Sequence, residues 1–93
     1  MPADVAEHSA AASLTADGAR RVRPLDRLEV AGLTTTHVRG VKAGGGVHVM
    51  LDQFTLLTDS GAWVLRFSTN QWQVDKDRQR MIDSVLATVS LGS

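Results

Sequence analysis

The chain has 93 residues, which is enough for one hydrophobic core but too few for two. Hydrophobic residues make up 43% and charged residues 22%, close to the globular average, so we expect a single folded domain over residues 1–93. Ten basic residues balance ten acidic residues, so the chain has no overall field to attract nucleic acid or an anionic membrane. The absence of cysteine excludes disulfides, thiolate metal sites and thiol nucleophiles.

The first residues do not have the pattern of a secretion signal. Asp4 and Glu7 stand where a signal peptide has basic residues, and alanine and serine follow instead of a strongly apolar stretch. No apolar run approaches the roughly 20 residues of a membrane-spanning helix. We therefore expect a cytoplasmic protein that does not insert into membranes.

A helix is predicted over residues 3–16. The segment is rich in alanine, follows Pro2 and ends before Asp17-Gly18, where glycine suits a helix stop. Its apolar stripe is thin, so tertiary contacts must supply much of its stability. The stripe consists of Val5, Ala6, Ala10 and Leu14.

Residues 25–69 read as a series of β-strands. A first strand is expected near residues 25–30, where the preceding Pro24 allows only a loop or an edge strand. Residues 34–39 form the second strand, residues 47–57 the third and residues 62–69 the fourth. If Leu57 pairs with Ala62, four cross-strand pairs lie on the same face, which we expect to be the core face. These pairs are Leu56 with Trp63, Phe54 with Leu65, Asp52 with Phe67, and Met50 with Thr69.

The opposite face of this hairpin is half apolar. Valine and leucine side chains alternate there with the polar side chains of Gln53, Thr55, Arg66 and Ser68. A face of this composition is not fully solvated, so we expect another part of the molecule to cover some of it.

A second helix is predicted after Asp75, which we expect to act as its N-cap. Apolar residues recur there with helical spacing, while Arg78 and Arg80 fall off the stripe. The stripe consists of Met81, Ile82, Val85, Leu86 and Val89. The whole chain thus predicts an α+β fold of order α-β-β-β-β-α, in which a three- to four-stranded antiparallel sheet is flanked by an N-terminal and a C-terminal helix.

This order resembles the C-terminal two-thirds of PsbP-like domains, to which bacterial LpqN-type lipoproteins belong. The resemblance spans roughly residues 3–91 and depends on Leu28-Glu29-Val30-Ala31-Gly32-Leu33, the return strand Gly61-Ala62-Trp63-Val64-Leu65-Arg66-Phe67 and the helical Ile82-Asp83-Ser84-Val85. It implies a truncated αβα sandwich without the family's N-terminal strands, signal sequence and lipid-bearing cysteine. Members mostly bind proteins or lack a known activity, and they share no catalytic residues, so the resemblance transfers no site.

Three histidines are the first candidates for chemistry, because imidazole ligates metals and carries protons near neutral pH. If Val41 pairs with Val47 across the glycine turn, His37 and His48 face opposite sides of the sheet and cannot share an ion. His8 has no ligand motif around it. We therefore expect no metal site.

Two further motifs suggest phosphate binding but have simpler explanations. The run 44–46 of three glycines precedes a strand, whereas a phosphate-binding loop opens a helix, so a hairpin turn is expected. Arg20, Arg21 and Arg23 form a basic cluster that could contact phosphates. The cluster lacks interleaved aromatic residues, so a solvated loop is the favoured interpretation.

Asp52 is the most unusual residue, because the hairpin register points this acid at the core beside Phe67. An unpaired buried charge is costly. A salt bridge or a shifted register is the favoured account, and a functional carboxyl with a raised pKa is the alternative.

We find no set of acid, base and nucleophile, and no cofactor motif, so we expect a non-enzymatic interaction module with no cofactor. The expected partner is a second copy of the chain, or another protein, at a sheet face or edge. Trp63 is predicted to lie in the core. The candidate contact residues are Trp72, Arg66, Gln53 and Thr55. The alternative is a small-molecule or lipid carrier, in which an aromatic layer opens into a pocket. That layer consists of Phe54, Trp63 and Phe67.

Overall fold

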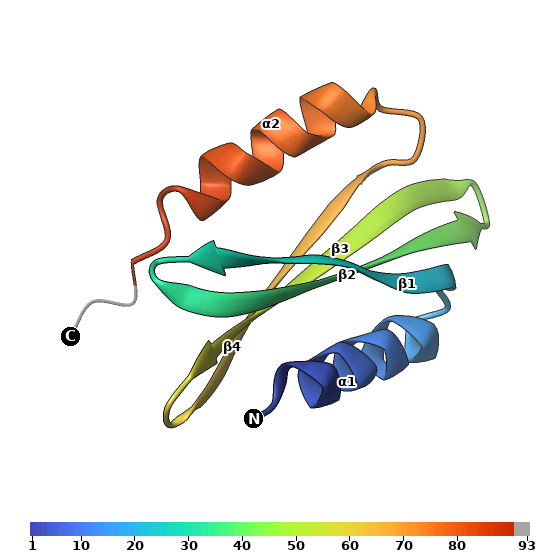
Figure 1. The fold of residues 1–93 in the computed structure, drawn as a ribbon. Helices are drawn as coiled ribbons and strands as arrows, with labels where there is room; N and C mark the ends of the chain where they lie inside the picture. Colours follow the sequence, from blue (N-terminus) through green and yellow to red (C-terminus); the bar gives the residue numbers. More distant parts are fainter. Residues whose placement is uncertain (91–93) are drawn as a thin grey trace.

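The computed structural model describes residues 1–90 and contains two helices and four strands (Figure 1). The last residue of the PsbP-like resemblance, Leu91, lies outside the described residues. In chain order the elements are α1 (Ala3–Ala16), β1 (Arg20–Val30), β2 (Leu33–Gly44), β3 (Val47–Thr58), β4 (Gly61–Asn70) and α2 (Asp75–Leu86). The strands form one antiparallel sheet in the order β1-β2-β3-β4. The predicted α-β-β-β-β-α order is therefore confirmed, with four strands in the sheet.

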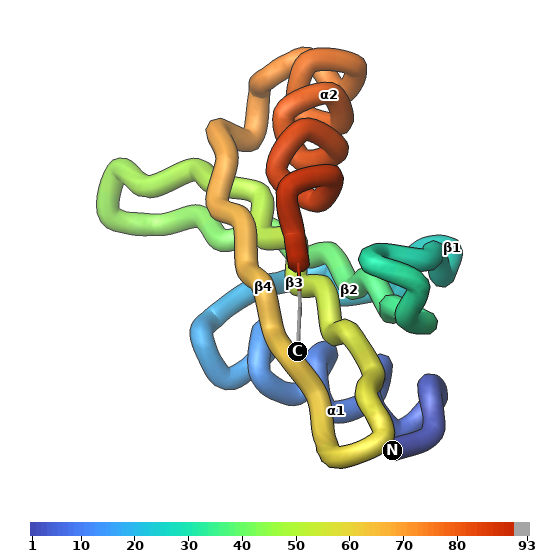
Figure 2. Tube along the Cα trace, turned by 90° about the vertical axis from the view of Figure 1, so that its left-hand side faces the viewer, coloured from blue at the N-terminus to red at the C-terminus, as the bar shows by residue number. Residues whose placement is uncertain are grey.

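The sheet lies between the two helices, which cover opposite faces (Figures 1 and 2). On one face α1 buries Ala6, Ala10 and Leu14, three residues at four-residue spacing. Leu14 packs in a cluster with Val38 of β2 and Leu51 of β3. The part of the molecule that covers the half-apolar face is thus α1. Its apolar stripe is thin, but its small alanine side chains let the helix lie close to the sheet.

The position of Gly40 in β2 shows how closely the chain packs on this face. A Cβ atom at Gly40 would lie 3.0 Å from both the Ala19 Cβ and the Val22 Cγ2. Real Cβ atoms seldom approach other atoms so closely, so only glycine fits between β2 and the start of β1 without displacing these side chains.

The second face is covered by α2, which starts beyond the end of β4 and ends beside the turn between β1 and β2 (Figure 1). Ile82 and Leu86 pack there with Phe54, Leu56 and Val30. The hydrocarbon core is therefore divided between both faces of the sheet, because each helix contributes its own apolar stripe.

Three details of the predicted α2 are wrong. Arg78 is 1% exposed and lies on the buried stripe, since residues 78, 82 and 86 follow each other at four-residue spacing. Val85 faces outward instead. Asp75 is the first helical residue rather than the N-cap, and its carboxylate contacts the Arg78 guanidinium. Because all three side-chain nitrogens of Arg78 donate hydrogen bonds, a charged residue is tolerated at a core position.

The β3–β4 register matches the prediction at every pair, but the β2–β3 register does not. Gly44 pairs with Val47, and Gly45 and Gly46 alone form the turn with φ values of 56° and 83°. Two successive left-handed residues are what a two-residue hairpin turn needs. Val41 consequently pairs with Met50 rather than with Val47. This three-residue difference reverses the face on which every β2 side chain was expected.

Strand β1 is an edge strand, as Pro24 predicts, but it starts at Arg20, earlier than expected. Its pairing with β2 is irregular between Arg20 and Arg23 and again between Leu25 and Leu28. Such irregularities bend a strand and re-aim its side chains.

The prediction that Trp63 lies in the core is wrong, although its pairing with Leu56 is correct. Trp63 is 60% exposed, because β4 is the outer strand and α2 diverges from its first half (Figure 2). The pairing pattern of a hairpin shows which side chains share a face, but it does not show how far a helix extends over that face.

Candidate functional site

The candidate site is the outer edge of β4, a strand on which most residues are exposed. β1 and β4 are the two edge strands of the sheet. β1 carries Pro24 and two irregularities, which protect an edge from pairing with other chains. β4 has ten residues, no proline and an unbroken register with β3 from Gly61 to Asn70. We call this strand with its exposed Trp63 and Val64 the β4 edge.

Two large apolar side chains mark the β4 edge. Trp63 is 60% exposed and its neighbour Val64 is 55% exposed. Successive strand residues point to opposite faces, so an apolar contact surface is offered on both sides of the same strand. An uncovered strand with apolar side chains on both faces is the arrangement that pairs with another strand.

The four expected contact residues occupy different environments. Trp72 is 69% exposed, and its ring lies 4.6 Å from the ring of His48, centroid to centroid. Gln53 and Thr55 are buried on the face that α1 covers, so in this conformation their side chains are inaccessible to a partner.

Arg66, the fourth expected contact residue, connects β4 to its neighbours. Its guanidinium donates to Gln53 Oε1 at 2.8 and 3.1 Å, to Ser13 Oγ at 2.9 Å and to the Asp17 carboxylate. The hydrogen bond from Arg66 and its positive charge lower the pKa of Asp17. Arg66 therefore fixes β4 against β3 and against the end of α1.

A polar cluster is buried on the α2 face of the sheet. Asp52 is fully buried, and its Oδ1 lies 2.6 Å from His37 Nε2 and 2.6 Å from Arg39 Nε. Burial by itself raises the pKa of Asp52, but the hydrogen bonds from His37 and Arg39 outweigh burial and hold the pKa below its usual value. Of the accounts left open by the sequence, the salt bridge is the one that the structure shows.

Sequence reasoning missed this cluster because it assigned His37 to the wrong face. His37 pairs with Phe54 and stacks on its ring with a centroid separation of 4.1 Å. The spacing of His37 and Arg39 indicates that both side chains lie on one face, since residues two apart on a strand share a face. This spacing was the sequence feature from which the cluster could have been found.

The histidines do not converge on a metal site. His37 and His48 face the same side of the sheet, so their predicted separation onto opposite faces is wrong. The two histidines are nevertheless far apart. His37 pairs with Phe54, which lies six residues along β3 from His48, and six residues of a strand span roughly 20 Å. Within residues 1–90 no three potential ligands come together to hold a metal ion.

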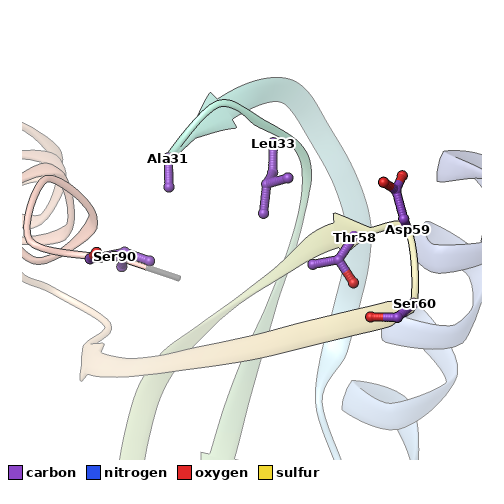
Figure 3. Close-up of a pocket in the computed structure, with 7 residues that line it drawn as sticks. Ala31, Leu33, Thr58, Asp59, Ser60 and Ser90 are labelled. Atoms are coloured by element: carbon purple, nitrogen blue, oxygen red, sulfur yellow. The ribbon is translucent and has the colours of Figure 1, made fainter. Parts of the chain in front are cut away.

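A hollow of about 590 Å³ opens between the β1–β2 turn, the β3–β4 turn and the segment after α2 (Figure 3). Small and polar side chains surround it, including Thr58, Asp59 and Ser60. None of the aromatic residues of the predicted carrier pocket lines it. Phe54 and Phe67 instead pack edge to face with centroids 5.6 Å apart. Phe54 does line a separate hollow with His37 and Leu28, but neither Trp63 nor Phe67 lines it, and the carrier alternative stays a prediction.

The basic residues near the start of β1 lie on a strand rather than in the expected loop. Arg23 is the register partner of Arg39, and both line a hollow together with Arg21. The sequence did not indicate that Arg39 belongs with the basic residues of β1, because it lies sixteen residues beyond Arg23. Only the pairing of β1 with β2 places Arg39 beside Arg23.

No family model, no curated protein and no solved structure matches this chain. The resemblance to PsbP-like domains and the cytoplasmic location therefore stay predictions. In the described part of the chain, no helix has the length and apolar character needed to cross a membrane.

Proposed function

We propose that the protein is a non-enzymatic interaction module that self-associates through the β4 edge. The single observation behind this proposal is a ten-residue outer strand of unbroken register with Trp63 and Val64 more than half exposed. Antiparallel pairing of β4 with β4 of a second copy would satisfy the free backbone groups and join two sheets into one.

A two-fold axis perpendicular to the sheet at Leu65 gives the most favourable register. In that register Trp63 lies opposite Phe67 of the second copy, Leu65 lies opposite its own equivalent, and Val64 lies opposite Arg66. Aromatic and apolar pairs across neighbouring strands each contribute about 0.2 to 1 kcal/mol. An axis at Arg66 would instead place two like charges directly opposite each other, which is destabilising.

A second copy is favoured over an unrelated partner because an antiparallel strand is complementary to itself. A two-fold interface uses the same surface on both chains, so one exposed edge suffices to close the assembly. Residues that hold β4 in place, above all Arg66, contact the same chain and leave the edge preformed.

Sedimentation velocity at micromolar concentration tests the proposal. The native chain is expected to sediment as a dimer, and Val64→Lys is expected to sediment as a monomer because it places two new charges near the two-fold axis. Val47→Lys is the matched control, since Val47 is also an exposed strand valine but lies at the β2–β3 turn. Circular dichroism of each variant checks that it is folded.

A native chain that remains monomeric at tens of micromolar would overturn the proposal. So would a dimer that withstands Val64→Lys, or one that Val47→Lys dissociates equally well, because the interface would then lie away from the β4 edge.

A further inference from the structure

We propose that the hollow formed by Arg21, Arg23 and Arg39 is a binding site for a small molecule that carries a phosphate group. The hollow has a volume of about 460 Å³ and lies between β1, β2 and the segment that leads into α2. No residue of β4 lines it, so the inference is independent of the proposed self-association.

Strand pairing brings the arginines together on one face. Arg23 and Arg39 are direct register partners, so their side chains leave the same face of the sheet. Like charges directly opposite each other destabilise a sheet. The repulsion between Arg23 and Arg39 is relieved when an anion binds between their guanidinium groups.

The backbone at Arg21 is a second, independent observation. Arg21 has a φ of 54°, in the left-handed region that side-chain-bearing residues rarely adopt, and it lies within the irregularity between Arg20 and Arg23. A non-glycine residue held there costs about 1 kcal/mol or more. In this conformation Arg21 joins Arg23 and Arg39 among the residues that line the hollow.

The charges around the hollow leave it positive. Arg39 is held by Asp52, and the acid on the rim, Asp75, is paired with Arg78. Neither Arg21 nor Arg23 forms an ion pair with any residue among 1–90. Two positive charges are therefore uncompensated, and Arg39 is already oriented by a buried carboxylate.

The other residues that line the hollow indicate which chemical groups the rest of the ligand carries. Val41 and Met50 pair across β2 and β3 and are half-buried in the hollow, and Gln71 adds an amide. Arginine is well suited to phosphate because its planar fork of N–H donors matches the oxygens. A phosphate ester with a small neutral or apolar portion fits this combination, either as a free metabolite or as a lipid headgroup.

The test is a titration with sn-glycerol 3-phosphate followed by ¹⁵N NMR, including the arginine Nε–Hε signals. We expect saturable shifts at Arg21, Arg23 and Arg39, and an affinity at least about tenfold weaker in the double variant Arg21→Ala/Arg23→Ala. The control Arg80→Ala/Lys42→Ala removes the same charge from exposed positions outside the hollow and is expected to bind within about twofold of the native chain.

Co-sedimentation with phosphatidylglycerol vesicles, with phosphatidylcholine vesicles as reference, separates the two sources of phosphate. Binding of glycerol 3-phosphate without vesicle binding identifies a free phosphate ester. Vesicle binding that the double variant loses and the control keeps identifies a headgroup. Absence of saturable shifts and of vesicle binding would overturn the proposal, as would a control variant that loses binding as fully as the double variant.

Discussion

His37 and Asp52 lie fifteen residues apart in the sequence, yet the imidazole Nε2 and the carboxylate Oδ1 are 2.6 Å apart on the α2 face of the sheet. They are diagonal neighbours, since His37 pairs with Phe54 and Asp52 pairs with Arg39. The carboxylate is thus shared between an imidazole and a guanidinium, which explains how an acid is accommodated in the centre of β3.

Asp52→Ala is expected to lower the free energy of unfolding by about 3 kcal/mol, because it leaves the largely buried Arg39 without its counter-charge and His37 without its hydrogen-bond partner. Urea denaturation at pH 7 measures the change. Asp59→Ala, in the exposed turn between β3 and β4, is the control and is expected to remain within about 0.5 kcal/mol of the native chain.

The same carboxylate predicts a loss of stability in acid. The pKa of Asp52 is lowered in the folded chain, so the folded state binds its proton less readily than the unfolded state does. This contribution is fully present above the unfolded pKa, about 4, and is lost as the pH falls through that value toward the folded pKa. Urea denaturation between pH 6 and pH 3 should show a smaller decline for Asp52→Asn than for the native chain. Parallel declines would contradict the assignment.

Arg78 is expected to be the most sensitive charged residue of α2. Its guanidinium donates to Thr69 Oγ1 at 2.9 Å and to the carbonyl oxygens of Asn70, Gln71 and Gln73, so it connects the helix to the end of β4. Arg78→Ala leaves buried acceptors unpaired and should lower the unfolding free energy by about 3 kcal/mol. Thermal denaturation compares it with Arg80→Ala, an exposed control expected to have little effect.

Lysine at position 78 distinguishes charge from geometry. Arg78→Lys keeps the positive charge but cannot reproduce the planar set of donors, so we expect it to recover only part of the stability. Full recovery by lysine would show that charge alone matters at this position.

Gly40→Ala is expected to destabilise the protein by about 1 to 3 kcal/mol, because its new methyl group would lie 3.0 Å from Ala19 and Val22 side-chain atoms. A double-mutant cycle with Val22→Ala checks the cause. The two changes together should cost less than the sum of the single changes, since Val22→Ala removes one of the two close contacts. Strict additivity would rule out this packing explanation.

Leu14→Ala tests whether α1 depends on tertiary contacts. Leu14 is fully buried against the sheet, so the truncation should cost about 3 kcal/mol. Val5→Ala, on the exposed side of the same helix, should cost well under about 1 kcal/mol. Chemical denaturation followed by circular dichroism measures both variants.

The sequence by itself determined the elements, their order and the β3–β4 register. These features depend on local chemistry, namely the spacing of apolar residues in α1 and α2, the alternation along β3 and β4, and the glycine-containing turns. Pro24 likewise limited its segment to a loop or an edge strand, because proline has no backbone N–H to donate to a neighbouring strand.

Tertiary structure alone decided the placement of charges and the exposure of Trp63. Arg78 became a core residue because four oxygen acceptors from the β4–α2 segment surround it, and Arg39 reached both Asp52 and Arg23 through strand pairing. The expected face of His37 was reversed by a local feature, because the glycine turn has two residues rather than more. The placement of the charges depends on which segments meet in space, and the free energy of a buried charge depends on those partners rather than on its sequence neighbours.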